Sequence, residues 1–244
     1  MRGDSMGPMH QVPEDWKTGL VVVAHPGDIE YEAAAAVHRW TKQGKRIRYV
    51  LVSRGEAGIA GLPPAQTGPL REKEELTAAN AVGVQDVEFL DYPDGRIEES
   101  LALRRDLARA IRRYRPEMVV LYNFHDTWAP GRANSADHRA VGRAALDAIA
   151  DAANEWIFTE LSGLPIWTAR WAAVTGPVVT HAVDVTDSIE AATESILAHS
   201  RYLAALGSSP VPVRARAIVE AATAPIEGFP AERAVGFELF YIRG

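Results

Sequence analysis

An unbroken apolar run near the N-terminus constrains the fold of this 244-residue chain more than any other stretch. Residues 20–24 read Leu-Val-Val-Val-Ala, which is typical of a strand buried on both faces of a parallel sheet. The run ends at His25-Pro-Gly-Asp28, and a helical pattern begins almost at once at Tyr31. Such a turn lies at the carboxyl end of the sheet, where open α/β sheets bind ligands. His25 and Asp28 could converge there as two metal ligands, although solvated polar residues beside a Pro-Gly turn give the same pattern.

Strands and helices alternate along the first half of the chain. The alternation predicts a parallel, doubly wound sheet with helices on both faces, in a single α/β domain. We expect that domain to span residues 16–244, after a disordered N-terminal arm of residues 1–15. The predicted strands are residues 20–24, 46–52, 87–90, 118–121, 171–174, 178–183 and 237–242. The predicted helices are residues 31–43, 70–82, 101–114, 138–152, 187–206 and 213–223.

Composition restricts the class of partner. The chain has a formal net charge of −6 and a pI near 5.7, which argues against nucleic acid or an anionic membrane as a main partner. No apolar run approaches the ~18 residues of a membrane span, and residues 1–11 lack the order of a signal peptide, so we expect a cytoplasmic protein. A homo-oligomer is compatible with the sequence. Because cysteine is absent, any metal must be held by His, Asp or Glu.

Polar residues recur where the predicted strands end. His25 and Asp28 follow the first strand, and the topology brings His138, at a later helix start, to the same edge of the sheet. Two histidines and one carboxylate match a catalytic zinc site with one position left open. Asp137 is either the N-cap of that helix or a hydrogen-bond partner of the metal site. Further polar residues at strand ends are Arg54, Glu56, His125 and Asp126, of which we expect Arg54, Glu56 and Asp126 to bind substrate.

Three ordered motifs resemble those of the PIG-L/LmbE-like family. They are His25-Pro-Gly-Asp28-x-Glu30, Arg54-Gly-Glu56 and Ala136-Asp-His-Arg139, and the resemblance extends roughly over residues 19–150. It implies a Rossmann-like fold and a zinc-dependent N-deacetylase that acts on an N-acetylglucosamine-type small molecule or glycoconjugate. It also implies Zn²⁺, or another divalent metal, bound by His25, Asp28 and His138.

Two positions depart from the family pattern. The family's first motif normally reads His-Pro-Asp-Asp, and its first aspartate is the general base; here that position is Gly27. The family's second motif often begins with a histidine that stabilises the transition state; here that position is Ser135. Gly27 is explained by an engineered Asp→Gly change, by a naturally silenced homologue, or by another acid such as Asp126 acting as the base. A missing base costs ~10²–10⁴-fold in rate, so the site could be slow rather than inert.

The alternatives come from other functional classes. A catalytically silenced homologue would act as a metal- or sugar-binding protein. A nucleotide-binding domain is disfavoured because the first turn lacks G-x-G-x-x-G and the chain has no Walker A sequence. A two-histidine, one-carboxylate site also suits Fe(II) oxygenases, but no other motif supports that chemistry. Three tryptophans, Trp128, Trp156 and Trp167, could line a pocket for the aglycone of a glycoside, although tryptophans more often pack in cores.

Overall fold

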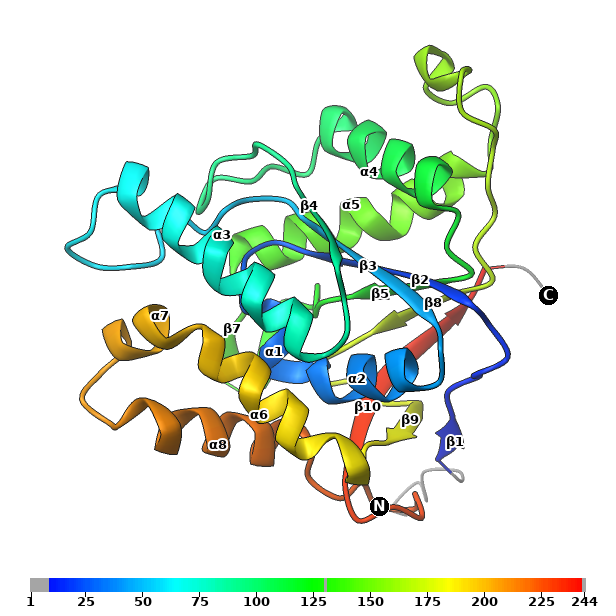
Figure 1. Cartoon of the computed structure of the whole chain (residues 1–244). Coiled ribbons are helices and arrows are strands. Elements are labelled where there is room, and N and C mark those ends of the chain that lie inside the picture. The colour runs from blue at the N-terminus through cyan, green and yellow to red at the C-terminus, as the bar shows by residue number, and fades with distance from the viewer. Residues whose placement is uncertain (1–8, 130, 243–244) are drawn as a thin grey trace.

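The computed structural model describes residues 9–129 and 131–242, which form one α/β unit around an eight-stranded sheet (Figure 1). The strand order is β1-β9-β10-β8-β5-β2-β3-β4, and every pair is parallel except the two that involve β10. The strands are β1 (His10–Gln11), β2 (Thr18–Val23), β3 (Arg46–Leu51), β4 (Asp86–Phe89), β5 (Met118–Leu121), β8 (Trp171–Val174), β9 (His181–Asp184) and β10 (Ala234–Tyr241). A separate two-stranded sheet pairs β6 (Thr127–Ala129) with β7 (Arg132–Ala133).

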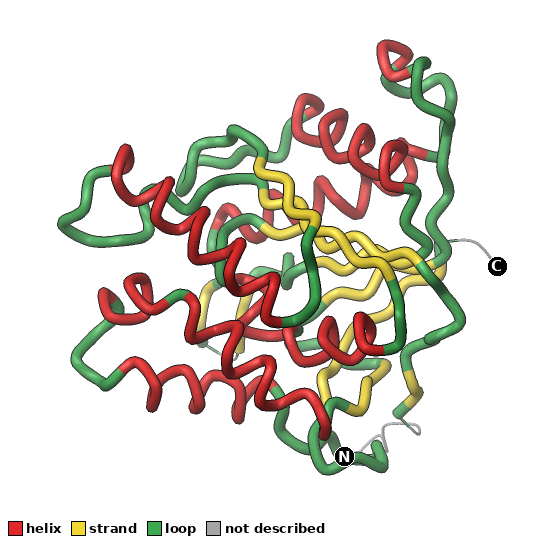
Figure 2. The backbone as a smooth tube through the Cα atoms, in the orientation of Figure 1, coloured by secondary structure: helices red, strands yellow, loops and turns green. Residues whose placement is uncertain are grey.

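Helices cover both faces of the large sheet (Figure 2). One face packs against α4 and α5, and the other packs against a group that includes α2, α6 and α8. The helices are α1 (Asp28–Glu32), α2 (Ala34–Lys42), α3 (Pro64–Ala81), α4 (Leu101–Tyr114), α5 (Ala136–Ala152), α6 (Ile189–Ala198), α7 (Ser200–Ala205) and α8 (Val211–Ala222). The predicted mostly parallel sheet with helices on both faces is confirmed.

The central strand β2 explains why the sheet is buried on both sides. Side chains alternate between the two faces of a strand, so neighbouring residues enter different cores. Leu20 and Val22 pack with α4 and α5, whereas Val21 and Val23 pack with the helices of the opposite face. The flanking strands β3 and β5 hold β2 in register on both sides. This arrangement fixes the position of the turn that follows Val23.

Two predicted helices are broken in the structure. The first divides into α1 and α2 at Ala33, whose φ of −131° is not helical. The predicted helix of residues 187–206 begins with a 3₁₀ turn, Thr186–Ser188, and divides into α6 and α7 at His199. The second break places the His199 imidazole in a fully buried position against α1 and α3. Periodicity along the sequence does not reveal such breaks, because they depend on contacts between helices.

The N-terminal boundary differs from the prediction. Residues 1–8 of the predicted arm lie outside the described residues. Residues 9–15 are not an arm: β1 pairs with β9, and Val12 is buried in the same core as Trp16. Glu14 contributes further, since its carboxylate accepts hydrogen bonds from Arg39 and Trp40. Among the described residues no helix is long and apolar enough to cross a membrane.

Candidate metal centre

The turn between β2 and α1 holds the first two candidate ligands. Asp28 is the first residue of α1, and its Oδ2 accepts hydrogen bonds from the backbone N–H groups of Ala24 (3.1 Å) and His25 (2.8 Å). These two bonds fix the carboxylate inside the turn and leave Oδ1 to face outward. His25 lies beside it, with Nδ1 3.4 Å from Asp28 Oδ2. The strand-to-helix turn therefore directs both side chains to one place.

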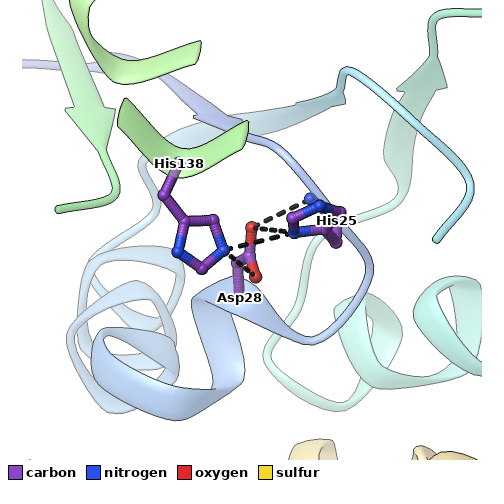
Figure 3. A group of neighbouring side chains, drawn as sticks. All are labelled: His25, Asp28 and His138. Carbon is purple, nitrogen blue, oxygen red and sulfur yellow. Dashed lines mark hydrogen bonds and ion pairs between the residues drawn. The ribbon is translucent and has the colours of Figure 1, made fainter. Parts of the chain in front are cut away.

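His138 reaches the same place from the first turn of α5. Ser135 is the N-cap of α5, because its hydroxyl accepts hydrogen bonds from the backbone N–H groups of Asp137 and His138. Asn134 Oδ1 lies 2.9 Å from Nδ1 of His138, which turns Nε2 toward the turn after β2. That Nε2 lies 3.2 Å from both Asp28 Oδ1 and His25 Nδ1 (Figure 3). One atom from each of the three side chains lies within 4.8 Å of the others, as ligands of one metal ion must.

The far side of the His25 ring meets two more carboxylates. Nε2 lies 3.1 Å from Asp137 Oδ2 and 3.1 Å from Asp94 Oδ1. Asp137 also accepts hydrogen bonds from the backbone N–H groups of Gly95 (2.6 Å) and Ile97 (3.1 Å). Of the two roles considered for Asp137, the structure therefore places it against His25, and Ser135 supplies the cap.

Two groups of side chains that share His25 could hold a metal ion. One is His25, Asp28 and His138, and the other is His25, Asp94 and Asp137. In the second group both oxygens of Asp137 are already used by backbone donors. The first group has two imidazoles, which suit zinc, and leaves the other ring nitrogen of each histidine hydrogen-bonded to a partner, as metal-bound histidines usually are.

The electrostatics of this centre favour a positive charge. Burial lowers the pKa of His25, but the carboxylates of Asp28, Asp137 and Asp94 outweigh it and hold that pKa well above its ordinary value. Burial raises the pKa of Asp28, yet the imidazoles of His138 and His25 keep it far below its usual range. Three carboxylates around two imidazoles thus stabilise a cation among them, which is the environment that a divalent metal requires.

A cavity of about 290 Å³, which we call the metal cavity, opens over these side chains. Its wall includes the Arg71 guanidinium, which donates hydrogen bonds to the backbone carbonyls of Gly55 and Pro26 and stacks on the ring of Tyr202. The side chains that line this cavity are His25, Asp28, Tyr31, Arg71, Asp94, Tyr122, Trp128, Ser135, His138 and Tyr202. Sequence reasoning missed Arg71 and Tyr202, which lie within helices and carry no motif. Asp94 had a weak signal in Pro93-Asp94-Gly95, at the end of a strand.

Gly27 lies under the metal cavity in a left-handed conformation, with φ 95° and ψ −20°. Its N–H donates a 2.9 Å hydrogen bond to Glu75 Oε2. A Cβ at this position would be 3.7 Å from Arg71 Nη2 and 4.0 Å from His199 Nδ1, which is ordinary contact. The space would therefore accept a side chain, while the backbone conformation favours glycine.

A fully buried cluster of Glu30, Glu75 and His199 lies behind that turn. His199 Nε2 is 3.5 Å from Glu30 Oε2 and 3.6 Å from Glu75 Oε2, and all three side chains are 0% exposed. Burial raises the pKa of Glu30 to about 8, and burial together with Glu30 raises that of Glu75 to about 8. Burial lowers the pKa of His199. Near neutral pH this cluster is mainly uncharged, so it joins α1, α3 and the break between α6 and α7 without a buried ion pair.

Three side chains expected to bind substrate do not line the metal cavity. Arg54 pairs with Glu72 and Asp91, and Glu56 accepts a hydrogen bond from the backbone N–H of Asp94. Asp126 is 80% exposed and pairs with Arg143. In this structure neighbouring polar groups engage all three side chains, and their binding of substrate stays a prediction. The exposed position of Asp126 outside the metal cavity gives no support to its role as a replacement base.

The tryptophans and the remaining histidines are distributed differently. Trp128 lines the metal cavity, whereas Trp156 is exposed and Trp167 donates a hydrogen bond to the Pro116 carbonyl. His125 Nε2 lies 2.7 Å from Glu238 Oε2, away from the candidate ligands. Of the three tryptophans, Trp128 is the one that lines the metal cavity.

Comparison with known proteins decides the family. Residues 20–149, which include all three candidate ligands, match the GlcNAc-PI de-N-acetylase (PIG-L) family. The chain belongs to this family. Its solved neighbours include the N,N'-diacetylchitobiose deacetylase of Pyrococcus horikoshii, with a TM-score of 0.80 and 22% sequence identity over 93% of this chain and 85% of that one. At that identity the likeness shows the shared PIG-L fold.

The curated relatives of this chain are named for more than one activity. A probable N-acetyl-alpha-D-glucosaminyl L-malate deacetylase 2 of Bacillus anthracis is 32% identical over 138 residues, 54% of this chain and 58% of that protein. The 4-oxalmesaconate hydratase of Pseudomonas putida is 29% identical over 119 residues, 46% of each chain. The chain thus spans about half the length of the curated relatives it matches.

Proposed function

We propose that this PIG-L protein is a metal-dependent N-deacetylase, which removes an acetyl or other acyl group from the amine of an N-acetylglucosamine-type small molecule or glycoconjugate. The observation that carries the proposal is the convergence of His25, Asp28 and His138 at the base of a cavity. Relatives named as deacetylases of such sugars support the substrate class.

His25, Asp28 and His138 would hold the metal, and Zn²⁺ fits their donor set best. The fit rests on fixed donors: two backbone N–H groups hold Asp28, and Asn134 orients His138. When bound, a divalent metal supplies Lewis acidity that polarises the acyl carbonyl. The carboxylates of Asp137 and Asp94 accept the Nε2 proton of His25 and keep Nδ1 directed at the ligand position.

The proton chemistry is where this chain differs from its family. Gly27 offers no carboxylate, and the Ser135 hydroxyl is used as the N-cap of α5. In the metal cavity, Asp94 is the lining carboxylate outside the proposed ligand set. Burial raises the pKa of Asp94, but His25 outweighs that effect and keeps it below its ordinary value, so Asp94 is ionised and can accept a proton. We assign it the role of a weak base, and we expect slow turnover.

The test combines metal content with acetate release. Purified protein should contain about one zinc ion per chain and release acetate from N-acetylglucosamine derivatives. The His138→Ala variant should lose the metal and the activity, because two remaining ligands hold zinc weakly. The control is His125→Ala, whose histidine binds Glu238 outside the cavity. A His138→Ala protein that keeps stoichiometric zinc removes His138 from the site.

The second candidate is a silenced PIG-L homologue that binds a metal ion or a sugar without turnover. Gly27 and Ser135 favour it, because both positions lack the acid–base groups that the family resemblance implies. Calorimetric titration of the zinc-loaded protein with N-acetylglucosamine derivatives separates the two functions. Saturable binding without acetate release over a day supports the silenced homologue.

A further inference from the structure

A second and larger cavity, of about 460 Å³, adjoins the metal cavity. We call it the distal cavity. The side chains of Tyr31 and Trp128 line both cavities, so the two share a wall. The rest of its lining is mostly small and apolar, and includes Val179, Ile218, Ala222, Pro225, Ile226 and Val235. A mostly apolar cavity beside a polar reaction site is suited to an apolar part of a substrate.

The distal cavity is built from a different part of the chain. The candidate metal ligands lie within the family match of residues 20–149, whereas much of the distal wall comes from residues 175–179, 218–226 and 234–236. These segments are the loop that follows β8, the C-terminal part of α8 with its following loop, and the start of β10. The candidate metal ligands and much of the distal wall therefore come from different parts of the sequence. The distal wall is where this protein's own substrate preference would be determined.

One polar side chain of the distal cavity, that of Glu32, lies toward the metal cavity. Glu32 is close enough to Asp28 and His138 for both charges to affect its pKa. Burial raises that pKa, which favours the neutral carboxyl. Within the described part of the chain, Glu32 Oε2 and Thr175 Oγ1 are buried without a well-formed hydrogen bond, and Thr175 lies close enough to Glu32 to lower its pKa. Both groups could therefore bond to the polar portion of a substrate where the cavities adjoin, and the apolar lining would face its other end.

We infer that the substrate carries an apolar chain, which occupies the distal cavity while the amide lies over His25, Asp28 and His138. The inference rests on the proposed deacetylase function and narrows its substrate class to amphiphilic amino sugars. This apolar chain of the substrate is part of either the aglycone or the acyl group, since each joins the sugar near its amide. Burial of each methylene should tighten binding up to about fourfold.

Binding measurements test this without turnover. Zinc-loaded protein is titrated calorimetrically, below the micelle concentration, with methyl and octyl 2-acetamido-2-deoxy-β-D-glucopyranoside and with N-acetyl- and N-octanoylglucosamine. We expect one octyl-length probe to bind about 10-fold or more tightly than its short partner. Tighter octyl glycoside binding assigns the chain to the aglycone, and tighter N-octanoyl binding assigns it to the acyl group. Equal affinities in both pairs overturn the inference.

A pair of variants on α8 tests whether the apolar chain of the substrate lies in the distal cavity. Ala221 lines the distal cavity and is exposed, so Ala221→Trp fills space without disturbing a packed core. Ala217 lies one turn earlier on the same helix, is also exposed and does not line the cavity, which makes Ala217→Trp the matched control. Ala221→Trp should abolish most of the long-to-short affinity ratio, and Ala217→Trp should keep it. A ratio unchanged by Ala221→Trp excludes the distal cavity as the site.

Acetate release from the methyl glycoside separates failure of this inference from failure of the proposed function. A chain-length gain in binding without any acetate release leaves the distal cavity as a binding site and removes the deacetylase proposal. Acetate release with no chain-length gain supports the deacetylase proposal and removes the inference about the distal cavity.

Discussion

Gly27 combines a φ of 95° with room for a side chain near Arg71 Nη2. Aspartate tolerates positive φ better than most residues, so an aspartate at this position would cost on the order of 1–3 kcal/mol in backbone strain. Its carboxylate would lie beside the Arg71 guanidinium, on the wall of the metal cavity. The guanidinium would keep the carboxylate ionised and therefore competent as a base.

We therefore expect Gly27→Asp to raise kcat for acetate release by ~10²-fold or more, with little change in KM, because a base acts in the transition state. The measurement is steady-state kinetics at matched zinc occupancy. Gly27→Asn is the control, since asparagine tolerates the same φ and has the same size but cannot take the proton. Equal rates in the two variants would rule out a missing base as the reason for slow turnover.

At the scale of elements, the buried cluster of Glu30, Glu75 and His199 links three helices behind the metal turn. Glu75 holds the turn through the N–H of Gly27, and its pKa is raised from 4.5 to about 8. Between those two pH values the folded protein binds more protons than the unfolded chain. The free energy of unfolding therefore falls as the pH rises through this window.

Glu75→Gln should reduce that loss of stability. The amide oxygen can still accept the Gly27 hydrogen bond, but the side chain no longer titrates. Between pH 5 and pH 8, urea unfolding should show a decline in unfolding free energy on the order of 3 kcal/mol smaller than in the parent. The comparison variant is Glu194→Gln, an exposed glutamate on α6. If the unfolding free energy of Glu75→Gln falls with pH as steeply as that of the parent, Glu75 is ionised in the folded protein.

The sequence predicted elements better where local pattern decides structure. Residues 118–121 and 171–174 are strands with the predicted bounds, and α4 begins where predicted because the Ser100 hydroxyl caps it. His25, Asp28 and His138 come together because the carboxyl ends of parallel strands share one edge of the sheet. Arg71 could not be found this way, because it lies within α3 and contacts Tyr202, far along the chain. The ion pairs that hold Arg54 and Asp126 outside the metal cavity could not be predicted, because strand-end position does not reveal which opposite charges lie nearby.

At the scale of the whole molecule, the candidate ligands join two distant parts of the fold. His25 and Asp28 follow the central strand, and His138 belongs to α5 on one face of the sheet. A metal bound by all three would bind the folded state and not the unfolded chain. It would stabilise the whole domain by about 2.7 kcal/mol at a free metal concentration 100 times Kd.

Removal of the metal should therefore lower the melting temperature by about 5–10 °C for a domain of this size. Differential scanning calorimetry before and after treatment with a chelator gives the shift, and added zinc should reverse it. His138→Ala should melt at the same temperature with and without chelator. A parent protein that melts identically in both conditions carries no structurally coupled metal at this site.

The antiparallel strand β10 has a consequence for the order of events during synthesis. It lies between β8 and β9, so β9 and β1 reach the rest of the sheet only through the last described strand of the chain. The residues of the metal centre leave the ribosome about a hundred residues before β10 does. A growing chain could thus complete its parallel block and bind metal early. The distal cavity, which needs residues 234–236, would form only once β10 is inserted. During synthesis the protein would therefore bind metal before the cavity that selects its substrate is complete.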